Sequence, residues 1–434
     1  MGCSSAPTEE EAEKKGKEFF QAIQTEDVKE VIATYGESTW KKEVTPEDLQ
    51  KTLQLNEEES MKSAHMDKVK QTDDAEFIID GQVMYETATA DFRLVLTKEL
   101  TVSSLEFQDP VAYMPMPDMI VEEDITVGAE TDFPLDGKLT LPKDASNPVP
   151  AVVLVHGSGP ADYDETVYGY KPFRDIAWGL AERGIASIRY DKRTYVYGSK
   201  SFAEGTEKVN VQEETIDDAL QAFNVVIKDE RIDQNHVYIT GHSLGGMLAP
   251  RMARDDERVA GIISLAGSPR SMTDISFDQQ QILLEEQQLP QTIHDQQQEE
   301  IDNLKEEVET TLSLPEEEII STQLLGMPAY YFWEMEQQPV EDIVTSLDIP
   351  MYFLQGDEDF QVFKDVDYEL WKELLRTNKQ ADFSSYPQLN HFFIKHDDEA
   401  ETLLDSYTKP GIVSEEVIDD MATWIHEQST KEGK

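Results

Sequence analysis

The chain has 434 residues, of which 89 are acidic and 37 are basic, so its formal net charge at pH 7 is -52. Nucleic acids and anionic membrane surfaces would repel such a chain, which argues against both as direct partners. Hydrophobic residues make up 39% of the sequence, which is enough to build a core and argues against global disorder. A surface this acidic is as typical of a salt-adapted protein as of an ordinary acidic extracellular one.

The first residues, Met1-Gly2-Cys3-Ser4-Ser5, lead into a polar, Glu-rich stretch. This start resembles the mature end of a bacterial lipoprotein, with an initiator Met in place of the removed signal peptide. The resemblance implies a lipid on Cys3 and an extracellular or cell-surface location. The myristoylation pattern fits less well, because Ala6 stands where it has Ser or Thr. Cys3 is the sole cysteine, so an intramolecular disulfide is excluded, and an incidental residue in a floppy terminus is the alternative.

The amino-terminal quarter of the chain predicts a tether and a small α+β domain. Residues 1–17 are charged and predict a solvated tether. Helical spacing of apolar residues follows over 18–35, and a second helix is expected over 46–59 after the N-cap Thr45. Alternating runs rich in Val, Thr, Ile and Phe predict strands at 75–80, 82–90, 92–97 and 100–108. The domain is therefore expected over 18–109, with His65 on its surface and a Pro-rich linker over 110–119.

From residue 120 to 434, strands alternate with helices, which is typical of a mostly parallel α/β sheet. Two leading antiparallel strands are expected, and the run at 150–155 is apolar throughout, as in a strand covered on both faces. The expected strands are 120–127, 137–141, 150–155, 185–190, 237–240, 259–265, 350–354 and 382–386, and the expected helices are 173–183, 212–229, 365–376 and 414–425.

The alternation breaks over 271–349, where two Gln runs occur. Such runs are typical of low-complexity disorder, but Leu and Ile recur there at helical spacing, so we expect helices that form an inserted lid. The aromatic residues Tyr330, Tyr331 and Trp333 either shape a pocket beneath this lid or belong to its plain core.

The sequence Gly241-His242-Ser243-Leu244-Gly245 fits the Gly-x-Ser-x-Gly pattern of a nucleophile elbow. That pattern needs a strand before the serine and a helix after it, and both are expected here. Glycines flank the serine because side chains there would collide with the neighbouring strand or helix. A chance match in a Gly/Ser turn is the alternative. The pattern predicts Ser243 as a nucleophile.

A nucleophilic serine needs a base and a carboxylate that orients the base. In hydrolases with this elbow, the serine, the acid and the histidine follow one another in that order along the chain. The acid is then expected after the strand at 350–354, in Gly356-Asp357-Glu358-Asp359. We expect Asp359, because this segment resembles the Gly-x-x-Asp loop of the α/β-hydrolase family, and Asp357 is the second choice. The base is then His391, His396 or His426. We expect His391, which follows the last strand, because His396 lies in a charged stretch and His426 in a helix.

Two backbone amides should hold the oxyanion. The N–H of Leu244, next to the nucleophile, is one donor. The other comes from the loop after the strand at 150–155, where we favour Ser158 over Gly159. His156 is expected to order that loop, and His242 to be a packing residue.

These residues together resemble the α/β-hydrolase family. More narrowly, the motifs at 156–166, 171–177 and 189–194 resemble those of bacterial serine esterases related to dienelactone hydrolases, and the resemblance covers residues 120–434 apart from the lid. Ala161 and Tyr163 depart from the family pattern, which has Asn and Arg there. The segment ahead of the hydrolase resembles a small cystatin-like domain found in bacterial lipoproteins.

The resemblance implies a serine carboxylesterase that hydrolyses short-chain acyl esters, with no metal and no organic cofactor. Two alternatives stay open. One is a serine peptidase or an acyltransferase that uses the same triad. The other is a surface-attached binding lipoprotein whose hydrolase domain is only a scaffold.

Overall fold

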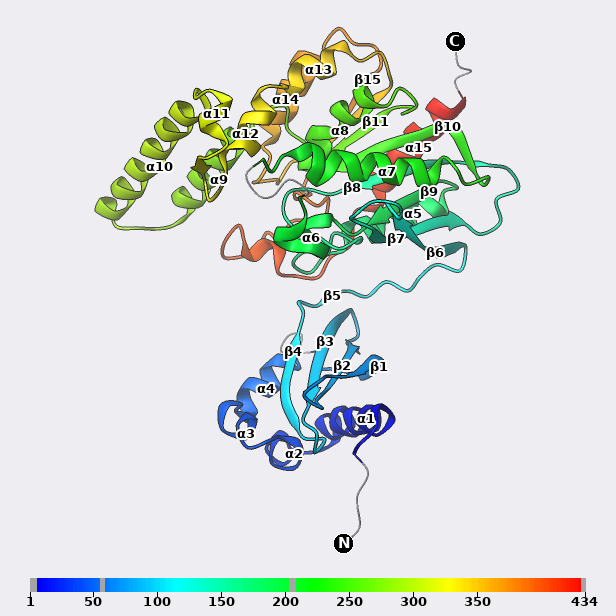
Figure 1. Cartoon of the computed structure of the whole chain (residues 1–434), viewed down its shortest axis with the longest axis vertical. Coiled ribbons are helices and arrows are strands. Elements are labelled where there is room, and N and C mark those ends of the chain that lie inside the picture. Colours follow the sequence, from blue (N-terminus) through cyan, green and yellow to red (C-terminus); the bar gives the residue numbers. More distant parts are fainter. Residues whose placement is uncertain (1–5, 55–58, 203–207, 431–434) are drawn as a thin grey trace. The chain divides into compact units, whose positions relative to one another are not determined.

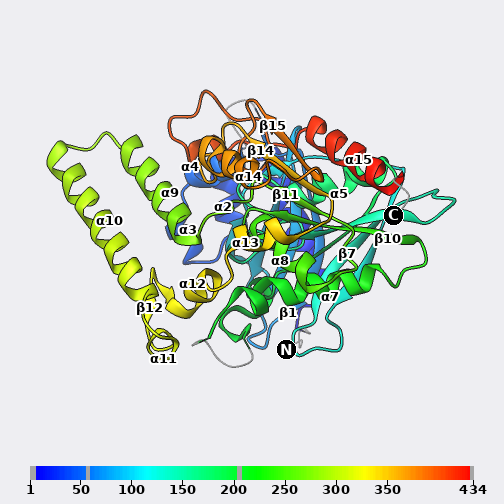
Figure 2. The ribbon, with the colours of Figure 1, turned by 90° about the horizontal axis from the view of Figure 1, so that it is seen from above.

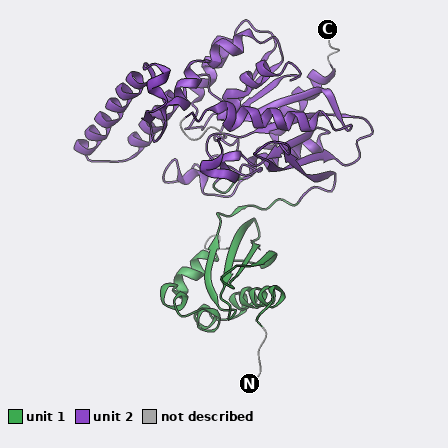
Figure 3. Cartoon of the chain, in the orientation of Figure 1, with its two compact units in different colours: residues 1–115, 168–170 green, residues 116–167, 171–434 purple. Residues whose placement is uncertain are grey.

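The computed structural model describes residues 6–54, 59–202 and 208–430. Cys3, with the predicted lipid site, lies outside these residues. The chain divides into two compact units, which Figure 3 colours separately. One comprises Met1–Pro115 with Tyr168–Tyr170, and the other comprises Met116–Val167 with Lys171–Lys434.

The smaller unit begins with helix α1 (Glu9–Thr25). Thr8 caps this helix, since its hydroxyl accepts from the Glu11 N–H while the Glu11 carboxylate accepts from the Thr8 N–H. Ala12 and Phe19 on its inner face are fully buried. The predicted tether over 1–17 is therefore wrong from residue 9 onward. The acidic residues at 9–11, which we interpreted as part of a solvated tail, form the first turn of a helix, where the helix dipole favours negative charge.

Three shorter helices follow: α2 (Val28–Tyr35), α3 (Trp40–Glu43) and α4 (Pro46–Thr52). The single helix predicted over 18–35 is in fact α1 and α2, because Asp27 accepts from the Lys29 N–H and starts a new helix. Thr45 caps α4 as predicted, at 3.1 Å from the Asp48 nitrogen.

The sheet of the smaller unit is antiparallel, with the order β1-β2-β3-β4 and with β5 paired to β3. The prediction missed β1, whose exposed polar sequence buries only Met66. It also placed strand breaks at Gly81 and Asp91, which lie inside β2 and β3. The strands are β1 (Ser63–Gln71), β2 (Phe77–Met84), β3 (Ala88–Leu96), β4 (Val102–Phe107) and β5 (Val111–Ala112), the last lying inside the predicted linker.

The larger unit is built on an eight-stranded sheet in the order β15-β14-β11-β10-β8-β9-β7-β6. Figure 1 shows this sheet within the larger unit. The pairs β6–β7 and β7–β9 are antiparallel and the other neighbours are parallel. All eight strands predicted for this region occur. They are β6 (Ile120–Val127), β7 (Leu135–Pro142), β8 (Val149–Val155), β9 (Ala186–Tyr190), β10 (Ile232–His242), β11 (Ile262–Leu265), β14 (Met351–Gly356) and β15 (Ala381–Tyr386).

Helices cover both faces of this sheet (Figure 2). Helices α7 (Asp217–Val226) and α8 (Leu244–Asp255) share a core with every second residue of β8, such as Val153. Helices α5 (Pro172–Glu182) and α15 (Glu415–Thr430) pack together on the other face. This arrangement explains why β8 is apolar throughout, since both of its faces are buried.

The predicted lid is helical, and the alternative of low-complexity disorder is wrong. A short hairpin interrupts its helices. In chain order the elements are α9 (Met272–Glu286), α10 (Gln291–Leu312), α11 (Glu316–Ile319), β12 (Gln323–Leu324), β13 (Met327–Pro328), α12 (Ala329–Glu336) and α13 (Val340–Ser346). No helix in the part of the chain that the structure describes is both long and apolar enough to span a bilayer.

Candidate active site

Ser243 sits at the turn between β10 and α8, the position that the elbow motif requires. Its backbone has φ 51° and ψ -115°, a left-handed conformation that non-glycine residues rarely adopt. Glycines make the turn possible. A Cβ on Gly241 would lie 2.1 Å from the carbonyl carbon of Gly245, and one on Gly245 would lie 2.2 Å from the Val155 oxygen. The strain at Ser243 is therefore imposed by the packing around it, as expected of a nucleophile elbow.

His391 and Asp359 are joined by a hydrogen bond of 2.7 Å between Nδ1 and Oδ2, and both side chains are buried. The other carboxylate oxygen of Asp359 accepts from the backbone N–H groups of Gln361 and Val362 at 2.7 and 3.0 Å. The Gln355 amide adds a bond of 2.8 Å to Oδ2. Three donors besides the imidazole thus fix the carboxylate, and the carboxylate in turn fixes the imidazole.

Asp357, the second choice for the acid, pairs instead with Lys364 at 2.5 Å. His396 is half-buried rather than solvated, and its backbone N–H bonds to the Gln388 oxygen. His426 is exposed, with Nε2 at 2.8 Å from the Arg183 oxygen. Of the three histidine candidates, His391 is the one that contacts an acid candidate.

His242 does more than the packing role expected of it. Its Nε2 lies 3.0 Å from the backbone oxygen of His391, and its Nδ1 lies 3.0 Å from Oε2 of Glu165. Burial lowers the pKa of His242, but the Glu165 carboxylate outweighs it, so the pKa is raised. Burial likewise raises the pKa of Glu165, and the charge of His242 outweighs it, so that pKa is lowered. The two side chains therefore form a buried ion pair next to the nucleophile.

The loop after β8 lies directly against Ser243. A Cβ on Gly157 would stand 3.2 Å from the Ser243 Cβ, so the absence of a side chain there lets the loop approach. Gly157 is held at both of its polar groups. Its N–H donates to Glu165 Oε1 at 2.7 Å, and its carbonyl accepts from Lys192 Nζ at 2.8 Å. Ser158 and Gly159 follow and line a cavity together with Ser243.

Leu244, the other predicted oxyanion donor, is the first residue of α8. The first N–H groups of a helix have no partner within it, and the helix dipole favours negative charge there. Leu244 also lines the cavity at Ser243. The structure therefore brings together at one cavity the two residues predicted to hold an oxyanion.

This cavity, which we call the elbow cavity, has a volume of about 490 Å³. Apolar side chains from the elbow, the lid and the loop after β14 form much of its wall, namely Leu244, Met247, Met272, Ile275, Leu325, Met327, Phe332 and Val362. Tyr331 lines it as well, whereas Tyr330 and Trp333 pack against each other at 5.6 Å between ring centroids. Of the aromatic residues singled out in the lid, Tyr331 thus belongs to the cavity.

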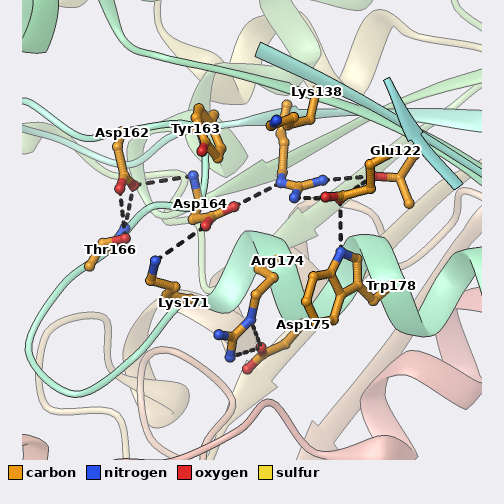
Figure 4. Close-up of polar contacts among 12 residues, drawn as sticks. Glu122, Lys138, Asp162, Tyr163, Asp164, Thr166, Lys171, Arg174, Asp175 and Trp178 are labelled. Atoms are coloured by element: carbon orange, nitrogen blue, oxygen red, sulfur yellow. Dashed lines mark hydrogen bonds and ion pairs between the residues drawn. The ribbon is translucent and has the colours of Figure 1, made fainter. Parts of the chain in front are cut away.

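A buried polar cluster anchors the loop between β8 and α5 (Figure 4). Arg189 on β9 is 1% exposed and bonds to Asp164 at 2.9 Å and to Glu122 at 2.6 Å. Glu122 also accepts from the Trp178 indole at 2.8 Å, and Lys171 lies 3.5 Å from Asp164. The cluster connects the loop to β6, β9 and α5, so these side-chain contacts, as well as the loop's own backbone, fix the geometry of the loop.

Two further predictions concern this loop. His156 orders it as expected, with Nε2 at 2.9 Å from the Asp162 oxygen, and burial lowers the pKa of His156 and keeps the ring neutral. Tyr163, where the family pattern has Arg, lies against the cations of Lys138 and Arg189, 5.8 and 5.7 Å from its ring centroid. The ring of Tyr163 thus packs against two cationic side chains, where the family pattern would place a third.

The described residues include no group of three His, Cys, Asp or Glu side chains arranged to hold a metal ion. His65, the histidine of the smaller unit, is exposed as predicted.

A mostly parallel sheet with a strained serine at the end of a central strand, followed directly by a helix, defines an α/β-hydrolase. The family described as serine aminopeptidase, S33, matches residues 146–398, and the chain belongs to it. This assignment and the relative described next confirm the prediction of a serine hydrolase.

The chain is 36% identical over 333 residues to esterase EstD of Thermotoga maritima, covering 76% of this chain and 72% of that protein. Among solved structures it is similar to Est1E of Butyrivibrio proteoclasticus, with 15% identity, a TM-score of 0.44 and coverage of 71% of this chain and 99% of that one. A dienelactone hydrolase described from Klebsiella pneumoniae gives 16% identity, a TM-score of 0.41 and the same coverage. The likeness of the smaller unit to a cystatin-like domain stays a prediction.

Sequence reasoning assigned no role to three charged residues that hold the loop beside Ser243, Glu165, Lys192 and Glu214, although the first two lie within the motifs at 156–166 and 189–194. Glu165 has φ 54°, so its backbone is in the left-handed region although nothing in the residue type signals it. Lys192 and Glu214 pair at 2.8 Å across 22 positions of sequence and are 2% and 6% exposed. A sequence pattern gives no sign of such a pair, because its members lie on separate segments.

Proposed function

We propose that this protein is a serine carboxylesterase in which Ser243, His391 and Asp359 form the catalytic triad. Ser243 Oγ attacks the ester carbonyl while His391 Nε2 takes its proton. Asp359 holds Nδ1 of the imidazole, which keeps Nε2 free to accept. The proton then passes to the leaving alcohol, and water releases the acyl group from Ser243 by the same route in reverse.

The negative charge that develops on the carbonyl oxygen is taken up by the N–H groups of Leu244 and Ser158. The N-terminus of α8 adds a favourable dipole at the same point. One donor of this kind typically contributes about 3 kcal/mol to transition-state stabilisation, so both must point at the oxygen.

The observation that carries the proposal is the neutral lining of the elbow cavity. Among the described residues that line it, Glu214 is the only one with an ionisable carboxylate or cation, and its oxygens already bond to Lys192 and to Tyr331. An aminopeptidase needs an acid free to bind the ammonium group of its substrate. An uncharged ester needs none, so the lining supports an esterase over a peptidase.

The name of the relative in Thermotoga maritima, an esterase, supports the same choice over a peptidase or an acyltransferase. A cavity of about 490 Å³ lies in the lower half of the range typical of small-molecule sites, roughly 300–1,000 Å³. We therefore propose short acyl chains as the preferred substrates. A scaffold without catalysis is disfavoured because it would need neither a strained serine at a cavity nor a histidine oriented by a buried carboxylate.

The test is turnover of p-nitrophenyl esters from acetate to dodecanoate, in parallel with aminoacyl p-nitroanilides. We expect the highest kcat/KM at acetate or butyrate and no anilide cleavage. Ser243→Ala should abolish turnover, whereas Ser321→Ala, which changes an exposed lid serine, should not alter it. Turnover that survives Ser243→Ala would refute the site, and faster cleavage of the anilides would favour the peptidase.

A further inference from the structure

The peptide unit between Gly157 and Ser158 is the part of the oxyanion site that has no helix to hold it. Leu244 is fixed by α8, whereas Ser158 lies in a loop. In a trans peptide the carbonyl and the N–H point in opposite directions. Whatever fixes the Gly157 carbonyl therefore also fixes where the Ser158 N–H points.

Lys192 holds that carbonyl. Its ammonium group donates to the Gly157 oxygen at 2.8 Å and lies 2.8 Å from Glu214 Oε1. The side chain is 2% exposed, so the carbonyl bond is charge-assisted and shielded from water. Rotation of the peptide unit would break this bond and leave an ammonium group buried with one partner fewer, which is costly.

Glu214 connects this contact to the lid. Its second oxygen accepts from the hydroxyl of Tyr331 on α12 at 2.7 Å, and the Tyr331 side chain is buried. Burial and the Glu214 charge keep the pKa of Tyr331 well above 10, so the hydroxyl stays a donor. A chain of three contacts thus runs from the lid through Glu214 and Lys192 to the Gly157 carbonyl.

We propose that Lys192 is a positioning residue for the oxyanion site, and that Glu214 and Tyr331 make its position depend on the seating of lid helix α12. Lys192 aims the Ser158 N–H into the elbow cavity by fixing the carbonyl on the opposite side of the same peptide unit. When α12 is seated, Tyr331 holds Glu214, and Glu214 holds the ammonium group against Gly157. The inference rests on the proposed function, because it assigns a role within the same site.

The decisive variant is the double substitution Lys192→Met with Glu214→Gln. It removes both charges together, so neither is left buried and unpaired, and replacing a buried ion pair in this way is often neutral for stability. We expect kcat for p-nitrophenyl butyrate to fall 10- to 100-fold while KM stays within twofold. Affinity for a trifluoromethyl ketone, which forms a tetrahedral oxyanion adduct on serine, should fall by the same factor as kcat/KM.

Tyr331→Phe tests the link to the lid, with Tyr330→Phe on the same helix as its matched control. The first removes the hydroxyl that bonds to Glu214, and the second leaves the ring that contacts Lys208. We expect a two- to fivefold loss of kcat and of ketone affinity in Tyr331→Phe and no change in Tyr330→Phe. Should the double variant fail to fold, a loss of kcat and of ketone affinity in Tyr331→Phe alone still supports the chain of contacts from α12 to the Gly157 carbonyl, and no loss refutes it.

The outcomes separate the two proposals. If the wild type turns over esters through Ser243 but the double variant keeps its kcat, or loses kcat without losing ketone affinity, the role of Lys192 is refuted and the esterase stands. Equal kcat in Tyr331→Phe and Tyr330→Phe refutes the link to the lid. Turnover that survives Ser243→Ala refutes the esterase site itself.

Discussion

Replacing Asp359 with asparagine should inactivate the enzyme without changing the shape of the site. Oδ1 of Asp359 accepts two hydrogen bonds, from the backbone N–H groups of Gln361 and Val362. In Asp359→Asn the amide oxygen must stay at that position, because an NH₂ group there would face two donors. The NH₂ group therefore takes the place of Oδ2, opposite Nδ1 of His391.

The magnitude follows from the tautomer that this arrangement forces. An NH₂ group donates to Nδ1, so the ring proton moves to Nε2, and Nε2 becomes a donor toward Ser243 instead of an acceptor. Loss of the base in this way typically costs about 10⁴ in kcat, or roughly 5 kcal/mol of transition-state stabilisation. Gln355 Nε2 also faces the new NH₂ group, which adds about 1 kcal/mol of destabilisation to the fold.

The assay is steady-state hydrolysis of p-nitrophenyl butyrate, with the thermal midpoint measured to verify folding. Asp357→Asn is the matched control, since Asp357 lies two residues away and pairs with Lys364 instead of a histidine. We expect the control to stay within twofold of wild type and KM to change little in either variant. A large loss in Asp357→Asn with activity retained in Asp359→Asn would refute the assignment of the acid.

Three further predictions follow from charge, and a fourth concerns the amino terminus. Burial and nearby acidic charges raise the pKa of Asp191 to about 6, so its ionisation costs stability as the pH rises from about 4 to 6. At pH 7.5, Asp191→Asn should raise the free energy of unfolding by about 1 kcal/mol after allowance for screening, and the thermal midpoint with it, whereas near pH 4 it should have no effect. The pKa of His242 is raised and that of Glu165 lowered, so their pair stabilises fully between about pH 4.5 and 6.5; the deficit in thermal midpoint of Glu165→Gln should be largest there, and a deficit that grows at higher pH would contradict the pairing. Raising NaCl from 0.05 to 1 M should raise the thermal midpoint of the wild type while changing kcat for a neutral ester less than twofold, as parallel melting and rate measurements would show. Mass spectrometry of the native amino terminus should show a lipid on Cys3, and an unmodified thiol would exclude the anchor.

Features with a local signal were predictable from the sequence. Central strands of the larger sheet, such as β8 and β14, follow from apolar runs, and the elbow follows from glycines whose missing side chains the turn requires. The order of Ser243, Asp359 and His391 along the chain, together with their places after expected strands, was sufficient to identify an acid and a base that are in contact.

Features made by distant segments were not predictable. Lys192 lies in the loop after β9, Glu214 before α7 and Tyr331 on α12, and none stands in a pattern that indicates its partner. Strand β1 was missed for a related reason, because its residues satisfy the backbone of β2 and bury little of their own. Tertiary context supplies what such segments lack in local signal.

The distribution of charge inside the larger unit explains why salt should act on stability more than on catalysis. Among the described residues, every buried carboxylate has a basic or histidine partner within 3.0 Å: Asp164 with Arg189, Glu165 with His242, Asp175 with Arg174, Glu214 with Lys192, Asp218 with Arg193, Asp359 with His391, and Asp367 with Arg270. The interior is thus close to neutral, and the excess of -52 lies at the surface.

Surface charges repel one another across distances that salt can screen, since the Debye length falls from about 10 Å at 0.1 M to about 3 Å at 1 M. In each charged pair around Ser243, the two partner atoms lie within 3.0 Å of each other, and both side chains are buried, where mobile ions do not reach. Salt therefore relieves the repulsion that opposes folding and leaves the field at the nucleophile nearly unchanged. A kcat for a neutral ester that followed the thermal midpoint across the same salt range would mean that the surface charge acts on the site itself.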